Sequence, residues 1–178
     1  MNQPEQPHRV VIAGGGPAAL EAALTLQRVA GHRVDVTVLA PDSHYVDRPT
    51  TVLEPFAAGR AGRRPLAKLV AKAGARLHAG TLATVETAEH RVRTTDGDVL
   101  DYDSLLLAVG AVPRAAPEHT LAFGAPGAEE AMHGLVQDLE GGYIRRIAFV
   151  VPAGATWSLP LYELALMTAD RVWDSGLS

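Results

Sequence analysis

The 178-residue sequence contains no cysteine. This absence excludes disulfide bonds, zinc–thiolate sites and cysteine nucleophiles within the chain. The seven histidines are scattered, and no pair has the H-x-x-x-H spacing of two metal ligands on one helix face. No G-x-S-x-G sequence occurs either, so the usual signal of a serine hydrolase is missing. We therefore expect neither a metal site nor a hydrolytic nucleophile.

The sequence also lacks long apolar runs and an excess of basic residues. No stretch approaches the roughly 18–20 apolar residues of a membrane span, and the polar start MNQPEQPHRV lacks the apolar core of a signal peptide. The formal charge is −4, whereas a nucleic-acid partner requires a basic face. We expect a cytoplasmic protein with no transmembrane segment and no nucleic-acid partner, and peripheral contact with a membrane stays open.

The first forty residues follow a strand–helix–strand pattern. The apolar run Val10 to Ala13 is typical of a strand buried on both faces. Residues Ala18 to Val29 are rich in Ala and Leu and predict a helix, with Gly31 as its C-terminal cap residue. Val34 to Leu39 is a second strand. This order predicts two parallel strands joined by a right-handed crossover.

The turn between the first strand and the helix is rich in glycine. Gly14-Gly15-Gly16-Pro17-Ala18-Ala19 fits the pattern G-x-G-x-x-G/A. Gly14 permits a tight turn, Gly16 lets the backbone approach a pyrophosphate, and Ala19 allows close packing of helix and strand. Pro17 suits the first helical turn, where its missing N–H costs nothing. The alternative is a tight turn that binds no ligand.

One part of the dinucleotide pattern is missing. An acidic residue normally ends the second strand and binds a ribose hydroxyl, but Leu39 or Ala40 stands at that place. Asp42 lies slightly beyond it and is a candidate substitute, while Asp35, inside the strand, is expected to face solvent.

The rest of the first half predicts a further helix and several strands. PLAKLVAK favours a helix, and a short strand follows near Arg76 to His78. Asp96-Gly97 predicts a hairpin with a type I′ turn, which has positive φ at both central residues. Leu105 to Val109 is another apolar strand, closed by Gly110.

The second half begins with a proline-rich connection, residues 113–126. Ala128 to Leu139 then predicts a helix that Gly141-Gly142 ends. Ile147 to Val151 predicts a strand, and Leu161 to Ala169 a last helix. This is a second strand–turn–helix unit.

Three stretches resemble the two-dinucleotide-domain flavoproteins, the pyridine nucleotide-disulfide oxidoreductase superfamily. The first is the glycine turn. The second, HYVDRPTTVLEPFAAG, His44 to Gly59, is similar to the segment that passes beside the flavin. The third, YDSLLLAVGAVPR, Tyr102 to Arg114, is similar to the second flavin signature, an apolar strand that ends in A-x-G. The nearest branch resembles the type II NADH dehydrogenases and sulfide:quinone oxidoreductases.

This resemblance implies bound FAD, with its pyrophosphate on residues 14–19, namely Gly14, Gly16, Pro17, Ala18 and Ala19. It implies that Arg48 lies near the flavin or its phosphates and that Leu82 lies near the adenine. An ordinary surface arginine and a core leucine are the alternatives. Ala108 and Gly110 match the small residues of the second signature, where the chain passes close to the cofactor.

The turn FVVPAGATWSLPLYELAL does not match an ordinary NAD site. Counted from the strand end, Pro152, Gly154 and Trp157 stand at the three glycine places. Counting back from Glu163, which is similar to a glutamate of the family's second helix, puts Thr156, Ser158 and Leu161 at these places. Pro fixes φ where the turn needs freedom, and an indole fills the place where helix and strand should nearly touch. Ser158 fits a helix cap better.

We therefore predict an α/β fold, with a Rossmann-like parallel sheet, an inserted antiparallel hairpin element and the start of a second, incomplete Rossmann-like domain. The predicted boundaries are an FAD-binding domain at 8–114, a connection at 115–127 and the second unit at 128–178. The family is considerably longer, so we expect an N-terminal portion. Apolar faces around Leu161 to Met167 then lack partners and favour association, including homo-oligomers.

The resemblance implies an FAD-dependent oxidoreductase, or the N-terminal part of one, that passes electrons to a quinone or another small-molecule partner. No catalytic side chain is identified, and the absence of cysteine excludes dithiol chemistry on the segment RPTTVLEPFAAG. The alternatives are an NAD(P)-binding Rossmann dehydrogenase domain and a non-catalytic nucleotide-binding remnant. The hairpin at Asp96-Gly97 disfavours the dehydrogenase, because flavoproteins of this type insert such an element.

Overall fold

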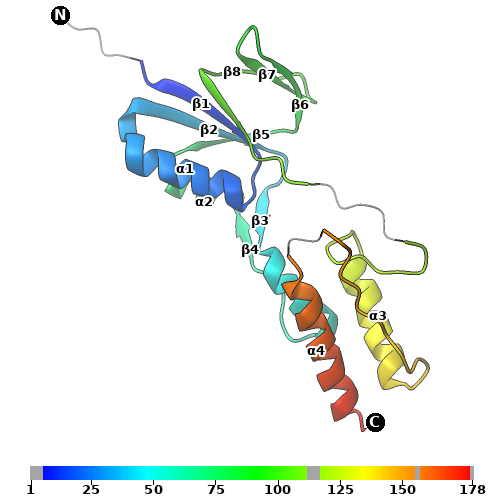
Figure 1. Cartoon of the computed structure of the whole chain (residues 1–178). Coiled ribbons are helices and arrows are strands. Elements are labelled where there is room, and N and C mark those ends of the chain that lie inside the picture. The colour runs from blue at the N-terminus through cyan, green and yellow to red at the C-terminus, as the bar shows by residue number, and fades with distance from the viewer. Residues whose placement is uncertain (1–5, 112–116, 155–156, 177–178) are drawn as a thin grey trace, which may run out of the picture. The chain divides into compact units, whose positions relative to one another are not determined.

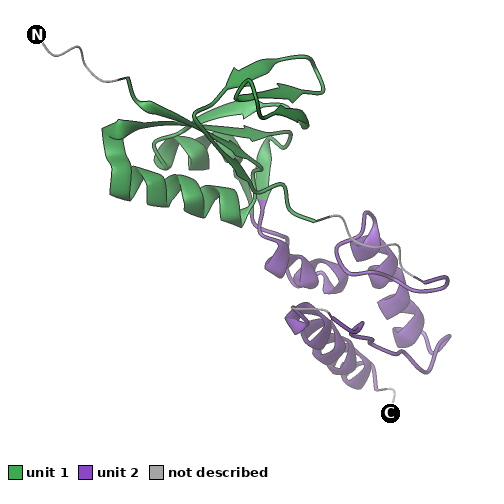
Figure 2. Ribbon diagram, turned by 45° about the horizontal axis from the view of Figure 1, so that its top comes forward, with its two compact units in different colours: residues 1–45, 63–111 green, residues 46–62, 112–178 purple. Residues whose placement is uncertain are grey.

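The structure, a computed structural model, describes residues 6–111, 117–154 and 157–176. Contacts divide the chain into two compact units, shown in green and purple in Figure 2. Unit 1 comprises residues 1–45 and 63–111, and unit 2 comprises residues 46–62 and 112–178. The segment 46–62, which the sequence analysis includes in the first domain, thus groups with unit 2, and the predicted domain boundaries stay a prediction.

Unit 1 is built on a four-stranded parallel sheet. The strands are β1 (His8–Ala13), β2 (Val34–Ala40), β5 (Arg76–Ala79) and β9 (Ser104–Leu107). Their order is β5-β2-β1-β9, and every neighbouring pair is parallel. The predicted strand–helix–strand unit and its parallel pair are confirmed.

Two helices cover one face of this sheet: α1 (Pro17–Ala30) and α2 (Leu66–Lys72) (Figure 1). Gly31 ends α1 with a φ of 55° and begins a short 3-10 turn, Gly31–Arg33. The predicted cap is therefore confirmed. Apolar side chains alternate along β1 and β2, so the helix-facing set forms one core with both helices: Val10, Ile12, Ala19, Ala23, Val36, Val38, Ala40, Leu66, Val70 and Ala73.

An antiparallel meander covers the opposite face (Figure 1). It consists of β6 (Leu82–Glu86), β7 (Arg91–Thr94) and β8 (Val99–Asp101), in the order β6-β7-β8. Val11 and Leu39, which point away from the helices, form a second core with residues of the meander and of the link that follows it. Its buried members are Val11, Leu39, Val92 and Tyr102. The predicted antiparallel element is confirmed.

The turn of the β7–β8 hairpin differs from the expected type. Gly97 has a φ of 92°, but Asp96 is not among the residues with positive φ. The Gly97 N–H donates to the Thr94 carbonyl at 3.1 Å, and the Thr94 N–H donates to the Asp98 carbonyl at 3.0 Å. These bonds describe a type I turn followed by a left-handed glycine, so the type I′ prediction is wrong. The extra residue accommodates the twist that a type I′ turn otherwise supplies.

A short two-stranded sheet joins the start and end of the segment between β2 and α2. Its strands are β3 (His44–Val46) and β4 (Arg63–Pro65). Between them runs the 3-10 helix η2 (Arg48–Phe56), which contains Pro55. The predicted helix after residue 65 is confirmed as α2.

Unit 2 packs η2 against two α-helices, α3 (Ala128–Glu140) and α4 (Leu159–Asp174). Its core consists of Val52, Phe56, Met132, Val136 and Leu164. Both predicted helices are confirmed, and α4 is longer at each end than the sequence indicates. Across the described residues, no helix combines the length and apolar character that crossing a bilayer requires.

The strand predicted at Ile147 to Val151 is not formed, and this prediction is wrong. The segment has no regular secondary structure. Ile147 and Phe149 pack against the unit 2 core, whereas Val150 and Val151 are 70% and 42% exposed. A strand requires a neighbour that satisfies its backbone N–H and C=O groups. In the described part of unit 2 no strand runs beside it, so its backbone has no strand to pair with.

Candidate dinucleotide site

The glycine turn connects the carboxyl end of β1 to the first turn of α1. Hydrogen bonds fix it to strands on both sides of β1. The Gly14 N–H donates to the Leu39 carbonyl of β2 at 2.8 Å, and the Ala108 N–H, just after β9, donates to the Ala13 carbonyl at 2.7 Å. The turn thus lies where the carboxyl ends of three parallel strands meet, which is where open α/β sheets bind ligands.

Gly14 is a glycine that the fold itself requires. Its φ is 130°, and a Cβ at this position would lie 2.1 Å from the Ala108 carbonyl oxygen. No side chain fits so close to a backbone atom. The first glycine of the motif therefore allows β1 and the end of β9 to come together.

Gly15 is constrained as well, although the sequence pattern leaves this position free. A Cβ here would lie 2.8 Å from Leu66 Cδ2 and 3.0 Å from the Ala40 side chain. The sequence pattern does not reveal the constraint on Gly15, because its neighbours come from β2 and α2, which are distant in sequence. No local signal could have found it.

Gly16 differs from both, because nothing in the fold demands a glycine there. Its φ is −83° and its ψ is −174°, which any residue adopts. A Cβ here would have no atom within 4 Å. The backbone is therefore open on this side, and a bulky ligand group has room to approach it.

The first turn of α1 has free hydrogen-bonding capacity. No side chain caps it, and the turn contains no acidic residue. Pro17 lies in the first turn as predicted, Ala18 is exposed, and Ala19 is fully buried beside Ala23. The Leu20 N–H closes the first intrahelical bond to the Gly16 carbonyl at 3.1 Å. Uncapped N–H groups and the helix dipole together favour an anionic group at this end.

The acidic candidates for the ribose occupy different places. Asp35 pairs with Arg76 at 2.7 Å. It lies beside Arg9 in the sheet register, at the end of β2 away from the glycine turn. Asp42 is exposed and follows the carboxyl end of β2. Asp42 is therefore the carboxylate whose position in the chain fits a ribose contact.

The other predicted site residues fall into three groups. Ala108 and Gly110 follow β9 next to the turn; Ala108 is half-buried, and Gly110 is exposed with a φ of 78°. Leu82 packs against the meander core. Arg48 is exposed and begins η2 in unit 2. Arg114, the end of the second signature, lies outside the described residues. The cofactor roles of all of them stay predictions.

The turn before α4 has no G-x-G-x-x-G pattern in its described part. Trp157 is half-exposed and meets Phe123 edge to face, with 6.4 Å between ring centroids. Ser158 is the N-cap residue of α4 as predicted, but its side chain makes no cap hydrogen bond. Pro160 is buried in the first turn. Thr156, which the count back from Glu163 places at the first glycine position, lies outside the described residues. Within those residues, no group of three His, Asp or Glu side chains could hold a metal ion.

These features define a Rossmann-like α/β unit: parallel strands, a glycine turn at their carboxyl ends, and a meander on the far face. Residues 3–144 match the family described as pyridine nucleotide-disulphide oxidoreductase. The match spans most of the sequence, and the chain belongs to this family. No curated protein sequence matches the chain at a significant level.

Solved structures show the same fold. The sulfide:quinone oxidoreductase from the hyperthermophilic bacterium Aquifex aeolicus superposes with a TM-score of 0.76 at 20% identity, covering 96% of this chain and 41% of that one. NDH2 from Plasmodium falciparum in complex with NADH gives a TM-score of 0.57 at 14% identity, covering 79% and 31%. A putidaredoxin reductase in a covalent complex with putidaredoxin gives a TM-score of 0.58 at 18% identity, covering 94% of this chain and 49% of that one. The chain thus spans less than half the length of these proteins.

Proposed function

We propose that the chain binds FAD on the glycine turn and is the flavin-binding part of an oxidoreductase. The single observation that carries this proposal is Gly16. A Cβ would meet neighbouring atoms at Gly14 and Gly15 but not at Gly16, where backbone angles are ordinary and space is open. An open glycine at the start of an uncapped helix is the arrangement that a pyrophosphate requires.

Membership in the pyridine nucleotide-disulphide oxidoreductase family supports the choice of FAD. The flavin, when bound, supplies the redox chemistry. The chain's own residues bind and orient it. Gly14, Gly16 and residues 17–19 hold the pyrophosphate, Asp42 takes a ribose hydroxyl, and Ala108 and Gly110 leave room beside it.

The proposed electron partners are named by chemical class. The similar structures include a sulfide:quinone oxidoreductase and an NDH2 in complex with NADH. A quinone or another small acceptor is the partner that we propose here. The absence of cysteine in the sequence leaves no dithiol relay within these residues.

The test is a titration of the purified chain with FAD, followed by desalting and an absorption spectrum. We expect flavin to stay with the chain and to be lost in Gly16→Trp. Gly134→Trp is the matched control, because Gly134 also has open space around its Cβ position and lies in α3 of unit 2. Retention by both variants would place the flavin elsewhere. A parallel titration with NAD⁺ decides between a flavin site and a nicotinamide dinucleotide site.

A further inference from the structure

Helix α4 has two apolar faces, and unit 2 uses only one of them. Leu164 and Thr168 are buried, and Met167 packs against the unit 2 core. An ion pair between Arg171 and Glu140 of α3, at 2.9 Å, also holds this side. The apolar face that the sequence analysis expected to lack partners, around Leu161 to Met167, is thus partly occupied within the chain.

The other face carries an exposed stripe, which we call the α4 seam. Its members share one side of the helix, and all are exposed: Leu159, Tyr162, Leu166, Ala169 and Trp173. Leu166 is 71% exposed and Trp173 is 80% exposed. The spacing alternates three and four residues, from 159 to 162, 166, 169 and 173. This is the a and d pattern by which one helix packs along another.

The seam is nearly symmetrical about Leu166. Leu159 and Trp173 lie seven residues on either side of it, since 166 − 159 and 173 − 166 are equal. A two-fold axis at Leu166 that makes two copies of α4 antiparallel therefore brings Leu159 of each copy to Trp173 of the other. A surface that matches itself in this way fits the two-fold interface of a homodimer.

Charge favours the antiparallel direction. Asp170 and Asp174 lie in the last turns of α4, at the negative end of the helix dipole, where a carboxylate is unfavourable. Among the described residues neither forms an ion pair. The first turn of α4 has no side-chain cap hydrogen bond and contains no acidic residue. In an antiparallel pair, each acidic end lies beside the uncapped, positive end of the other helix.

We propose that two copies of this chain associate through antiparallel packing of their α4 seams. The same charges disfavour a membrane surface, because interfacial helices carry Lys and Arg beside their apolar face, whereas Asp170 and Asp174 flank the seam. A single helix pair is a small interface, so we expect a dimer with a dissociation constant on the order of micromolar. The proposal does not depend on FAD binding.

The first test is sedimentation of the whole chain with and without a charge in the seam. We expect Leu166→Glu to weaken dimerisation by roughly tenfold or more, because it places two carboxylates together at the two-fold axis. Leu24→Glu is the matched control, because Leu24 is an exposed helical leucine of α1 in unit 1, 49% exposed. A monomeric wild-type chain, or equal loss in both variants, would overturn the proposal.

The second test exploits the absence of cysteine, which makes a single introduced thiol unambiguous. Under mild oxidation, we expect Leu166→Cys to form a disulfide-linked dimer. Trp173→Cys should not cross-link to itself, but it should cross-link to Leu159→Cys when the two variants are mixed. Efficient self-cross-linking of Trp173→Cys would show a parallel pair and contradict the proposed arrangement. Binding of the monomeric chain to phosphatidylcholine vesicles through the seam would show a lipid partner instead.

Discussion

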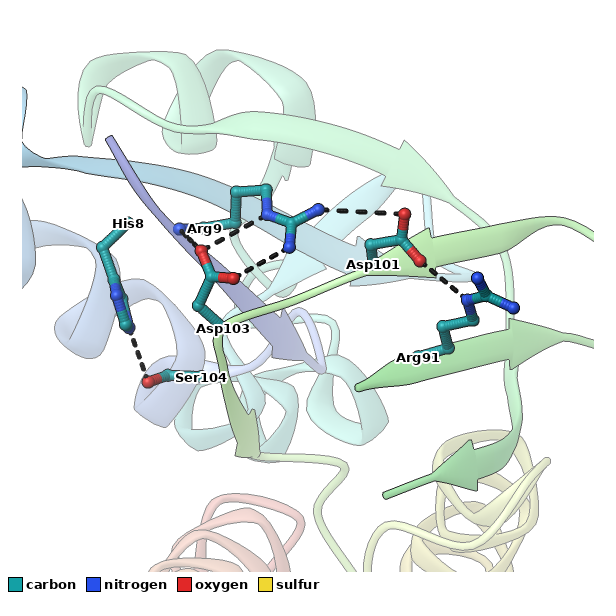
Figure 3. A network of polar contacts seen from close by, with 6 residues as sticks. All are labelled: His8, Arg9, Arg91, Asp101, Asp103 and Ser104. Carbon is teal, nitrogen blue, oxygen red and sulfur yellow. Dashed lines mark hydrogen bonds and ion pairs between the residues drawn. The ribbon is translucent and has the colours of Figure 1, made fainter. Parts of the chain in front are cut away.

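Arg9 holds Asp103 through three hydrogen bonds from one residue. The Arg9 backbone N–H donates to Oδ2 at 2.7 Å, and its guanidinium donates to Oδ1 at 2.8 Å and to Oδ2 at 3.3 Å (Figure 3). In return, the Asp103 N–H donates to the Arg9 carbonyl at 2.9 Å. Asp101, at the end of β8, joins Arg9 and Arg91 in the same network. The network ties the start of β1 to the link between the meander and β9.

This pairing makes the stability of unit 1 depend on pH. The hydrogen bonds from the Arg9 side chain and backbone hold the pKa of Asp103 well below its usual range. A carboxyl with a lower pKa in the folded state adds stability above its unfolded pKa, about 3.9, and this contribution is lost as the pH falls through the folded pKa. We expect Asp103→Asn to lower the urea midpoint at pH 7, with the difference from wild type shrinking below about pH 4.

The control for that series is Asp42→Asn. Asp42 is exposed and makes no side-chain hydrogen bond in the described part of the chain. Its urea midpoint should follow that of the wild type from neutral to acid pH. A constant difference between Asp103→Asn and wild type across the whole range would contradict the assignment.

Gly14→Ala should damage the fold as well as the site. The added methyl group meets the Ala108 carbonyl oxygen at 2.1 Å on a residue with a φ of 130°. Gly97→Ala is the control, because Gly97 has a φ of 92° but open space around its Cβ position. Strain alone costs about 1 kcal/mol, and we expect Gly14→Ala to exceed this at least about twofold. Urea denaturation followed by circular dichroism gives both values.

Leu66→Ala should weaken the packing of the hydrophobic core against the glycine turn. Leu66 is fully buried, and its side chain lies against the position where a Cβ of Gly15 would be. Removing a buried leucine side chain costs about 2–5 kcal/mol, so we expect both a lower free energy of unfolding and weaker FAD retention. Leu24→Ala, at a position 49% exposed in α1, should change neither. Full FAD retention in a clearly destabilised Leu66→Ala would show that the turn does not rely on this contact.

His133→Leu tests the packing of η2 on α3 within unit 2. The His133 ring contacts the Pro55 carbonyl oxygen through Nδ1 at 2.7 Å. Loss of this hydrogen bond should cost about 0.5–1.5 kcal/mol. Both tryptophans of the sequence, Trp157 and Trp173, belong to unit 2, so tryptophan fluorescence during urea unfolding reports on this unit. Gln137→Leu, one turn further along α3, is the control and should leave the midpoint near that of the wild type.

Local patterns were enough to predict most elements of unit 1. The apolar run of β1, the breaker-free helix α1 and the cap at Gly31 depend on neighbours within a few residues, which a sequence displays directly. The same holds for the glycine turn, because φ at Gly14 and the first turn at Pro17 are local properties. Helices α3 and α4 could also be predicted from the sequence, since helical hydrogen bonds form within one segment.

Tertiary structure decided what depends on partners distant in the chain. The segment Ile147 to Val151 has the composition of a strand but no neighbour to pair with, so it forms none. The constraint on Gly15 arises from Leu66, and the reason for Gly14 arises from Ala108, which no local pattern contains. Periodicity showed that α4 is amphipathic, but only packing showed which of its apolar faces unit 2 buries and that the seam around Leu166 stays exposed. The backbone conformation of a segment depends mainly on adjacent residues, whereas strand pairing and side-chain burial depend on which distant segments come into contact.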